Sequence, residues 1–157
     1  MSSRRGMEEN LTRPFESLFC KRHHIYPLFY EDHFFLSIVT VDYTFRRVNQ
    51  EFEPRFIKIL IWDSLPNSTR PEIAKRVFKE FYHRRVSMQF GVNFPLERIE
   101  TSSEDSIKQS NGDDCGLFTI YNVWKYFTDL GYVSTLHYEH DSDSIGPELR
   151  KIIINVQ

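Results

Sequence analysis

Two short segments rich in aromatic and β-branched residues stand out from the polar sequence around them. Residues 34–41 and residues 56–62 each predict a strand, and the first is apolar enough to be covered on both faces of a sheet. The polar segment 42–54 that joins them predicts a loop or a long hairpin tip. A shorter apolar run at residues 25–30 contains Pro27, which favours an edge strand or an irregular strand.

Apolar residues at helical spacing predict a helix over about residues 69–85. Thr69 and Glu72 have the spacing of a capping box, in which each side chain bonds a free backbone N–H of the first turn. Pro71 falls in that same turn, where its missing N–H has no intrahelical partner to lose. These residues therefore mark the expected start of the helix.

A second helical pattern begins at Cys115 and continues to about Leu130, with Gly131 as a stop signal. Between the two helices, a short strand is predicted around residues 96–100. The polar segment 101–114 that follows predicts a loop, which leads directly into the N-terminus of the second helix.

The chain has 157 residues, which is the size of one ordinary domain. We expect residues 1–12 to form a flexible tail. We expect residues 13–157 to form a single domain that ends in a short element of uncertain type at residues 148–156. A hydrophobic fraction of 40% and a charged fraction of 27% are typical of a soluble globular protein rather than a disordered one. The formal charge of −2 argues against a strongly basic nucleic-acid binder.

The sequence has no apolar stretch of the roughly 20 residues that a membrane-spanning helix needs. Its polar first residues also lack the apolar region of a signal peptide, so we expect an intracellular protein, in the nucleus or the cytoplasm. Cys20 and Cys115 are then expected to be free thiols rather than a disulfide. Histidines cluster near Cys20 and again at residues 137–140, but without the spacing of a zinc site, so no metal is expected.

Cys115 stands at the start of the second predicted helix, after a loop that contains Gly112 and Asp114. The helix dipole and the free backbone N–H groups of the first turn stabilise a thiolate at such a position. The same N–H groups can bind an oxyanion, and Gly116 lets the backbone approach a bound acyl group. A cysteine that merely packs in a core is the simpler alternative for a lone thiol.

His33 precedes the first predicted strand, and Asp63 follows the second. If the two strands pair as an antiparallel hairpin, the start of one lies opposite the end of the other, and the carboxylate can orient the imidazole. A surface histidine and a turn-forming aspartate remain the alternatives. Asp42 is the second candidate carboxylate, but the hairpin places it at the opposite end of the strand. A thiol at a helix start together with a His–Asp pair is the arrangement of a cysteine protease.

The segment Gln109–Phe118, with the sequence QSNGDDCGLF, resembles the nucleophile motif of the SUMO-specific (sentrin-type) proteases, and the chain order His, Asp, Gln, Cys matches as well. The resemblance implies a papain-like α+β fold, with a small mixed or antiparallel sheet flanked by helices. It also implies that Cys115 is the nucleophile, that His33 is the base and that Asp63 is the acid. Gln109 would then supply the oxyanion-hole side chain, because its amide can donate to developing negative charge.

The resemblance also indicates where the substrate lies. The family usually has Trp after the catalytic His, beside a narrow tunnel for the Gly-Gly tail, and this chain has Phe34 there. Phe35 and Trp62 are the candidates to compensate for the smaller ring. Gly116 and Asp114 complete the expected substrate-binding set. Only 32 residues precede His33, fewer than the family usually has in the region that helps to recognise the modifier.

The expected activity is cleavage after the C-terminal Gly-Gly of SUMO or a related ubiquitin-like modifier, in deconjugation or precursor processing. No cofactor is needed, and the expected partners are the modifier and its conjugates, bound by a monomer, with no nucleic acid or membrane. The basic patches at residues 46–47 and 83–85 are either solvated faces or contacts to the modifier. The alternatives are a catalytically weak or inactive relative that binds a modifier, a cysteine protease of the same fold with another substrate, and a truncated copy that folds poorly alone.

Overall fold

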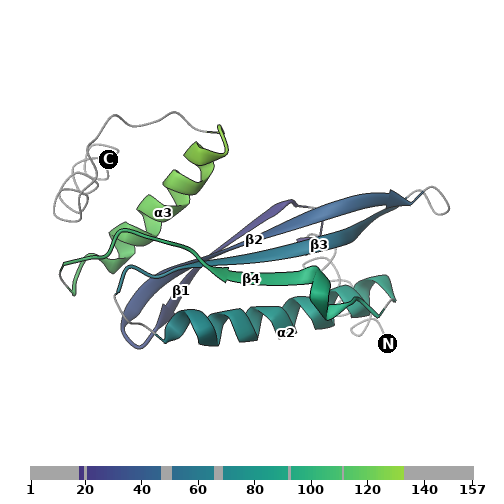
Figure 1. The fold of residues 1–157 in the computed structure, drawn as a ribbon, viewed down its shortest axis with the longest axis horizontal. Helices are drawn as coiled ribbons and strands as arrows, with labels where there is room; N and C mark the ends of the chain where they lie inside the picture. Colours follow the sequence, from purple (N-terminus) through teal and green to yellow (C-terminus); the bar gives the residue numbers. More distant parts are fainter. Residues whose placement is uncertain are drawn as a thin grey trace, which may run out of the picture.

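The computed structural model describes residues 18–19, 21–46, 51–65, 69–91, 93–110 and 112–132. In chain order its elements are β1 (His23–Tyr30), β2 (His33–Arg46), β3 (Glu51–Trp62), α2 (Arg70–Phe90), the short 3-10 helix η1 (Leu96–Arg98), β4 (Ile99–Ser103) and α3 (Cys115–Asp129). Figure 1 shows α2 below the strands and α3 above them. The predicted tail at residues 1–12 and the predicted last element at 148–156 lie outside the described residues.

The four strands form one sheet in the order β1-β2-β3-β4. The pairs β1–β2 and β2–β3 are antiparallel, whereas β3 and β4 are parallel, so the sheet is mixed. β1 is an edge strand, as its proline predicts, because Pro27 pairs with Leu36 on one side only. No helix among the described residues is long and apolar enough to cross a bilayer.

Both faces of the sheet are covered, as the continuous apolar run in β2 predicts. Odd-numbered residues of β2 and β3 face α2 and form the larger core with it. These residues are Phe35, Val39, Val41, Ile57, Ile59 and Ile61, together with Ala74, Tyr82 and Val86 of α2. Even-numbered residues face α3 and form a smaller core, which comprises Leu36, Ile38, Leu60 and Trp62 packed by Val123 and Tyr126. The period of two along each strand thus assigns one face to each helix.

Of the two structures predicted for residues 42–54, the hairpin tip is confirmed for most of the segment and the loop is not. After a register shift between Asp42 and Tyr43, pairing of β2 with β3 continues as far as Arg46 and Glu51. Phe45 and Phe52 are cross-strand partners whose ring centroids lie 5.2 Å apart. A polar two-stranded ribbon outside the core has loop-like composition, and here an aromatic cross-strand pair stabilises it.

The boundaries of the other elements need smaller corrections. Thr69 makes no side-chain capping bond, so the predicted capping box is wrong, and Glu72 instead pairs with Lys75 at 2.5 Å. α2 runs on to Phe90 and ends at Gly91, whose φ of 61° is left-handed. The strand predicted around residues 96–100 begins at Ile99, because η1 occupies the preceding three residues.

Candidate active site

His33 and Asp63 lie in contact at one end of the sheet. The imidazole Nε2 of His33 is 2.8 Å from Oδ1 of Asp63, and the two residues are only 2% and 4% exposed. The last ladder pair is Leu36 with Trp62, so one further step places Asp63 opposite Phe35 and diagonal to His33. Diagonal neighbours on one face are within reach of a long side chain. The hairpin therefore brings together the two residues that the sequence analysis paired.

The contacts around this pair determine which ring nitrogen of His33 is available for proton transfer. Oδ1 of Asp63 bonds Nε2 of His33 and also accepts from the backbone N–H of Leu65 at 2.9 Å. The His33 ring stacks on Phe35, with centroids 6.4 Å apart and planes 6° apart. Because Asp63 engages Nε2, Nδ1 is the atom that can exchange a proton with a thiol.

A tight turn places His33 at the very start of β2. Glu31 and Asp32 join β1 to β2, and both have positive φ, 51° and 52°. Such a two-residue turn matches the twist of a hairpin but favours Asn or Gly, so these residues adopt it at a cost. Arg70 of α2 holds the turn, since its Nε donates to the carbonyl of Tyr30 at 3.3 Å and its guanidinium lies 3.7 Å from the Glu31 carboxylate. Sequence reasoning missed Arg70, which has no local pattern to mark it.

Cys115 is the first residue of α3, as predicted, and it is a buried free thiol. A Cβ built on the next residue, Gly116, would lie 3.9 Å from Cδ2 of Phe34, the residue after His33. The dipeptides 33–34 and 115–116 are therefore neighbours, although they lie about half of the chain apart in sequence. Asp114 is the buried N-cap residue of α3 and makes no side-chain capping bond.

Gln109 is anchored to the residue that follows Asp63. The hydroxyl of Ser64 donates to Oε1 of Gln109 at 2.5 Å, and the backbone N–H of Gln109 donates to the carbonyl of Ser64 at 2.9 Å. Both residues are buried. The loop before α3 is thereby fixed to the residue that follows Asp63 at the end of β3.

Two further side chains from the same loop hold the backbone of Asp63. Ser106 Oγ and Lys108 Nζ both donate to the Asp63 carbonyl oxygen, at 2.9 Å and 2.8 Å. Neither residue was singled out from the sequence, because an isolated polar residue in a loop ordinarily faces solvent. Their shared acceptor shows that this loop packs along the residues just after β3.

The residues expected at the substrate have different environments. Phe34 is 42% exposed and its ring lies 4.7 Å from that of Phe29, which supplies an aromatic neighbour that the sequence analysis missed. Trp62, in contrast, is 8% exposed and packs against Tyr126 in the core below α3. Its ring is part of that core rather than of an open wall, which corrects the expectation that it compensates for Phe34.

Asp42, the second candidate carboxylate, lies where the hairpin argument places it, toward the other end of β2. Its Oδ1 accepts from Arg22 at 3.0 Å, and both side chains are exposed. A solvent-exposed ion pair of this kind contributes little to stability. Asp63 is therefore the carboxylate that the structure pairs with His33.

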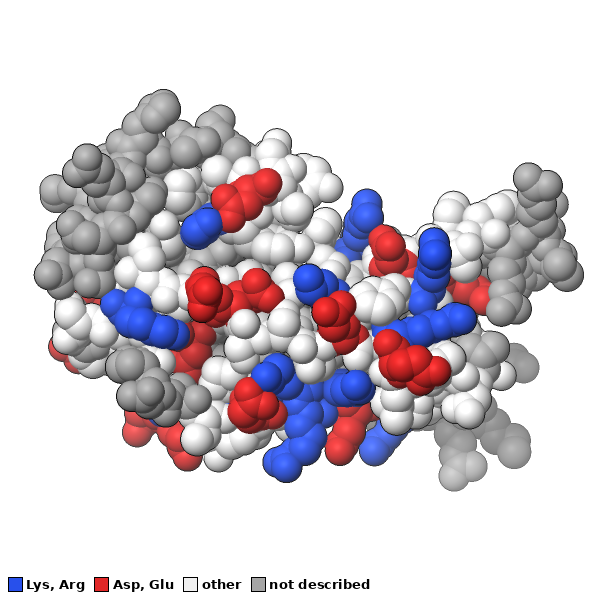
Figure 2. All heavy atoms as spheres, viewed as in Figure 1, with Lys and Arg blue, Asp and Glu red and all other residues white. Residues whose placement is uncertain are grey.

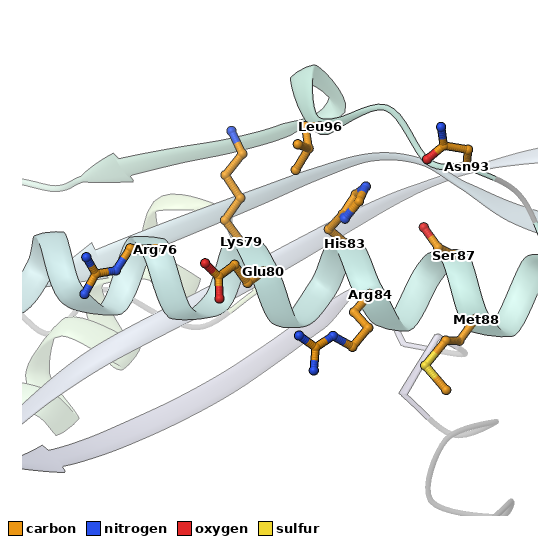
Figure 3. Close-up of a pocket in the computed structure, with 9 residues that line it drawn as sticks. All are labelled: Arg76, Lys79, Glu80, His83, Arg84, Ser87, Met88, Asn93 and Leu96. Carbon is orange, nitrogen blue, oxygen red and sulfur yellow. The ribbon is translucent and has the colours of Figure 1, made fainter.

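A cavity of about 710 Å³ lies along α2, away from the candidate site residues. Its lining comprises Arg76, Lys79, Glu80, His83, Arg84, Ser87, Met88, Asn93 and Leu96 (Figure 3). His83 and Arg84 belong to the predicted basic patch, whereas Arg85 lies over the Phe81 ring. Figure 2 shows acidic and basic side chains interspersed on the face that it displays. The cavity is open and lacks a nucleophile paired with a base, so its lining does not form a catalytic site.

Comparisons with known proteins agree with the motif resemblance. A family model described as the Ulp1 protease family, C-terminal catalytic domain, matches residues 3–148. A search of curated proteins finds no match. One similar solved structure is titled "Crystal structure of the de-sumoylating protease", with a TM-score of 0.56 and 22% identity. That likeness covers 88% of this chain and 53% of the other, so this chain spans about half its length. The predicted α+β fold of the ubiquitin-like-protein protease type is confirmed.

Proposed function

Because the chain belongs to the Ulp1 protease family of cysteine peptidases, we propose that it hydrolyses the bond after the C-terminal Gly-Gly of SUMO or a related ubiquitin-like modifier. One observation supports this proposal most strongly: Phe34, which follows the buried His33 of the His33–Asp63 pair, approaches Gly116, which follows Cys115 at the start of α3. A helix N-terminus, a base and a carboxylate that orients the base are the parts that nucleophilic catalysis by a thiol requires.

The proposed reaction starts with transfer of the thiol proton of Cys115 to Nδ1 of His33, while Asp63 stabilises the imidazolium through Nε2. The thiolate attacks the carbonyl carbon of the terminal glycine, and the carbonyl oxygen becomes an oxyanion. The backbone N–H of Cys115 and the side-chain amide of Gln109 donate to that oxygen. His33 then protonates the leaving amine, and the C–N bond breaks to give a thioester.

Hydrolysis of the thioester completes the cycle. His33, again neutral, takes a proton from water as the water attacks the acyl carbon. The tetrahedral intermediate collapses with release of the Cys115 thiolate, which recovers the proton from His33. The products are a free glycine carboxylate and an amine, and the enzyme returns to its starting state without any cofactor.

The approach of Phe34 to Gly116 supports a substrate tail without side chains. Phe34 and Phe29 form an exposed aromatic pair on one side, and Gly116 leaves its own side without a Cβ. A Gly-Gly tail that runs along the surface of these residues brings no side chain of its own to clash with Phe34. The body of the modifier would then lie beyond them, where its surface selects the partner.

Activity-based probes test the proposal directly. Ubiquitin, SUMO and related modifiers, each with an electrophile in place of the terminal carboxylate, are incubated with the protein and analysed by intact-mass and peptide mass spectrometry. We expect a covalent adduct on Cys115 with SUMO or one close relative, and none with Cys115→Ala. The His33→Ala variant should label far more slowly, because its thiol lacks the base.

Other outcomes distinguish the alternatives. An adduct with ubiquitin alone would assign a different substrate to the same chemistry. Binding of an unmodified modifier in calorimetry, without any adduct from its probe, would indicate a relative that binds but does not cleave. A folded protein that shows neither binding nor labelling with any modifier would overturn the proposal.

A further inference from the structure

Two adjacent residues, Asp63 and Ser64, bond two different parts of the candidate site. The carboxylate of Asp63 bonds the imidazole of His33 at 2.8 Å, and the hydroxyl of Ser64 bonds Oε1 of Gln109 at 2.5 Å. All four of these residues are buried. One dipeptide directly after β3 therefore reaches two separate partners.

The Ser64 hydroxyl bonds the oxygen end of the Gln109 amide, which is the end that an oxyanion does not use. A glutamine side chain has an acceptor oxygen at one end and a donor NH₂ at the other, and an oxyanion needs the donor. Oxygen and nitrogen are interchanged by a simple rotation of the amide. Because the hydroxyl of Ser64 donates to Oε1, that rotation would replace a buried donor–acceptor contact with one in which the hydroxyl needs a new acceptor.

The backbone of the same two segments keeps the donor and acceptor in register. The N–H of Gln109 donates to the Ser64 carbonyl at 2.9 Å. Lys108 and Ser106 both donate to the carbonyl of Asp63. Segment 106–109 therefore lies alongside residues 63–64 through four hydrogen bonds, and the one donated by the Ser64 hydroxyl reaches the side-chain amide of Gln109 at Oε1.

We propose that Ser64 is a positioning residue, which holds the Gln109 amide with its NH₂ toward the oxyanion. The dipeptide Asp63-Ser64 thus orients both the base and the oxyanion donor. This role rests on the proposed function, because it concerns the same reaction. Ser64 does not touch the substrate, and its whole effect on the reaction passes through Gln109.

The kinetic test is a double-mutant cycle on the modifier substrate. Gln109→Ala should lower kcat by roughly 100- to 1,000-fold, the usual effect of removing one oxyanion donor. Ser64→Ala should lower kcat by about 10- to 100-fold with KM nearly unchanged, because the amide then spends most of its time misaligned. In the Gln109→Ala background, Ser64→Ala should have no further effect, since its target is absent.

Ser106→Ala is the matched control, because Ser106 is a loop serine whose hydroxyl bonds Asp63 rather than Gln109. Its effect on kcat should be the same in the wild-type and Gln109→Ala backgrounds. Ser64→Cys keeps only a weak donor and should rescue little of the activity. Thermal melting of every variant shows whether the fold persists. Independent, multiplicative effects of Ser64→Ala and Gln109→Ala on kcat would overturn the proposal, as would an unchanged kcat in Ser64→Ala.

A second readout does not depend on turnover. The side-chain amide of Gln109, assigned by the loss of its NMR signals in Gln109→Ala, should be rigid in the wild-type protein and mobile in Ser64→Ala, by heteronuclear relaxation. An amide that stays equally rigid without the hydroxyl would refute the positioning role. If the wild-type protein cleaves no modifier while this NMR difference is present, the proposed function fails and the Ser64–Gln109 coupling stands.

Discussion

The two faces of the sheet differ in how much they bury. Among the described residues, the core on the α2 face comprises a dozen buried residues, including the fully buried Tyr82, whereas the α3 face has four buried residues of the sheet and, on α3 itself, the buried Phe118 and Tyr121. The two faces also differ in their polar groups. On the α2 face, the hydroxyl of Tyr82 is hydrogen-bonded to the hydroxyl of Tyr26 at 2.7 Å and to Nδ1 of His24 at 2.6 Å. Stability is therefore concentrated on the α2 side.

The candidate site lies where these two sides meet. His33 stacks on Phe35, which belongs to the core of the α2 face, and Cys115 begins the helix on the other face. The base and its acid are thus attached to the better-packed side, and the nucleophile to the less-packed side. Substitutions on the two sides should therefore separate effects on stability from effects on catalysis.

The largest expected effect is on catalysis at the end of β3. Asp63→Asn keeps the size of the side chain but loses the charge that stabilises the imidazolium, so kcat/KM should fall by about 10,000-fold. Asp42→Asn is the matched control at the other end of the hairpin, and its kcat/KM should be unchanged. Steady-state kinetics on a modifier–peptide fusion measures both. Equal effects of the two variants would contradict the assignment of Asp63.

The next largest effect is on the free energy of unfolding, which should fall by different amounts when each face loses a side chain. Tyr82→Ala removes a fully buried ring from the α2 face, which should lower the free energy of unfolding by about 3–5 kcal/mol. Val123→Ala removes two methyl groups from a half-buried position on the α3 face and should cost about 1 kcal/mol. Urea denaturation measures both values. A cost for Val123→Ala as large as that for Tyr82→Ala would refute the difference between the faces.

A smaller change isolates the polar part of the α2 face. Tyr82→Phe keeps the ring but removes the hydroxyl that bonds both His24 and Tyr26. Because these two groups then lose their buried partner, the free energy of unfolding should fall by about 1–3 kcal/mol. The kcat of the variant should match that of the wild type, because Tyr82 does not contact the site. A stability equal to wild type would mean that the network contributes nothing to folding.

The sequence predicts the parts of this comparison that depend on local pattern. The apolar run from Phe34 to Val41 predicts a strand covered on both faces, and the hairpin logic pairs His33 with Asp63. Cys115 at the start of a helix follows from the polar loop before it. Each of these signals lies within a short window of chain, which is the range over which periodicity is informative.

The parts that could not be predicted depend on contacts between distant residues. Ser64 and Gln109 are 45 positions apart, and neither shows a pattern that marks the other as its partner. The polar composition beyond Asp42 fits a loop as well as a hairpin tip, so it does not decide how far the pairing of β2 with β3 continues. The inward position of Trp62 depends on which face of β3 meets α3, and that is fixed only when the helix packs.

The smallest expected effect is a pH dependence of stability. Two adjacent histidines of β1, one on each face of the sheet, allow the two faces to be compared. His24 is buried on the α2 face and stacks on Tyr82, whereas His23 is half-buried among Tyr126 and Phe127 on the α3 face. Burial lowers the pKa of His24, and the neighbouring His23 lowers it further, against the opposing hydrogen bonds to backbone carbonyls. Burial also lowers the pKa of His23, and so does the charge of Arg22.

A lowered pKa means that the unfolded chain binds protons first as the pH falls. Above about pH 7.5 both states are neutral and stability is constant, and below the unfolded value near 6.5 the free energy of unfolding decreases, by at most about 1.4 kcal/mol per pH unit for each histidine. Urea titrations between pH 8 and 5.5 should show this slope in the wild-type protein. His24→Asn should remove more of the slope than His23→Asn, since the α2 face excludes water more completely. A larger loss from His23→Asn would reverse the order of the two faces.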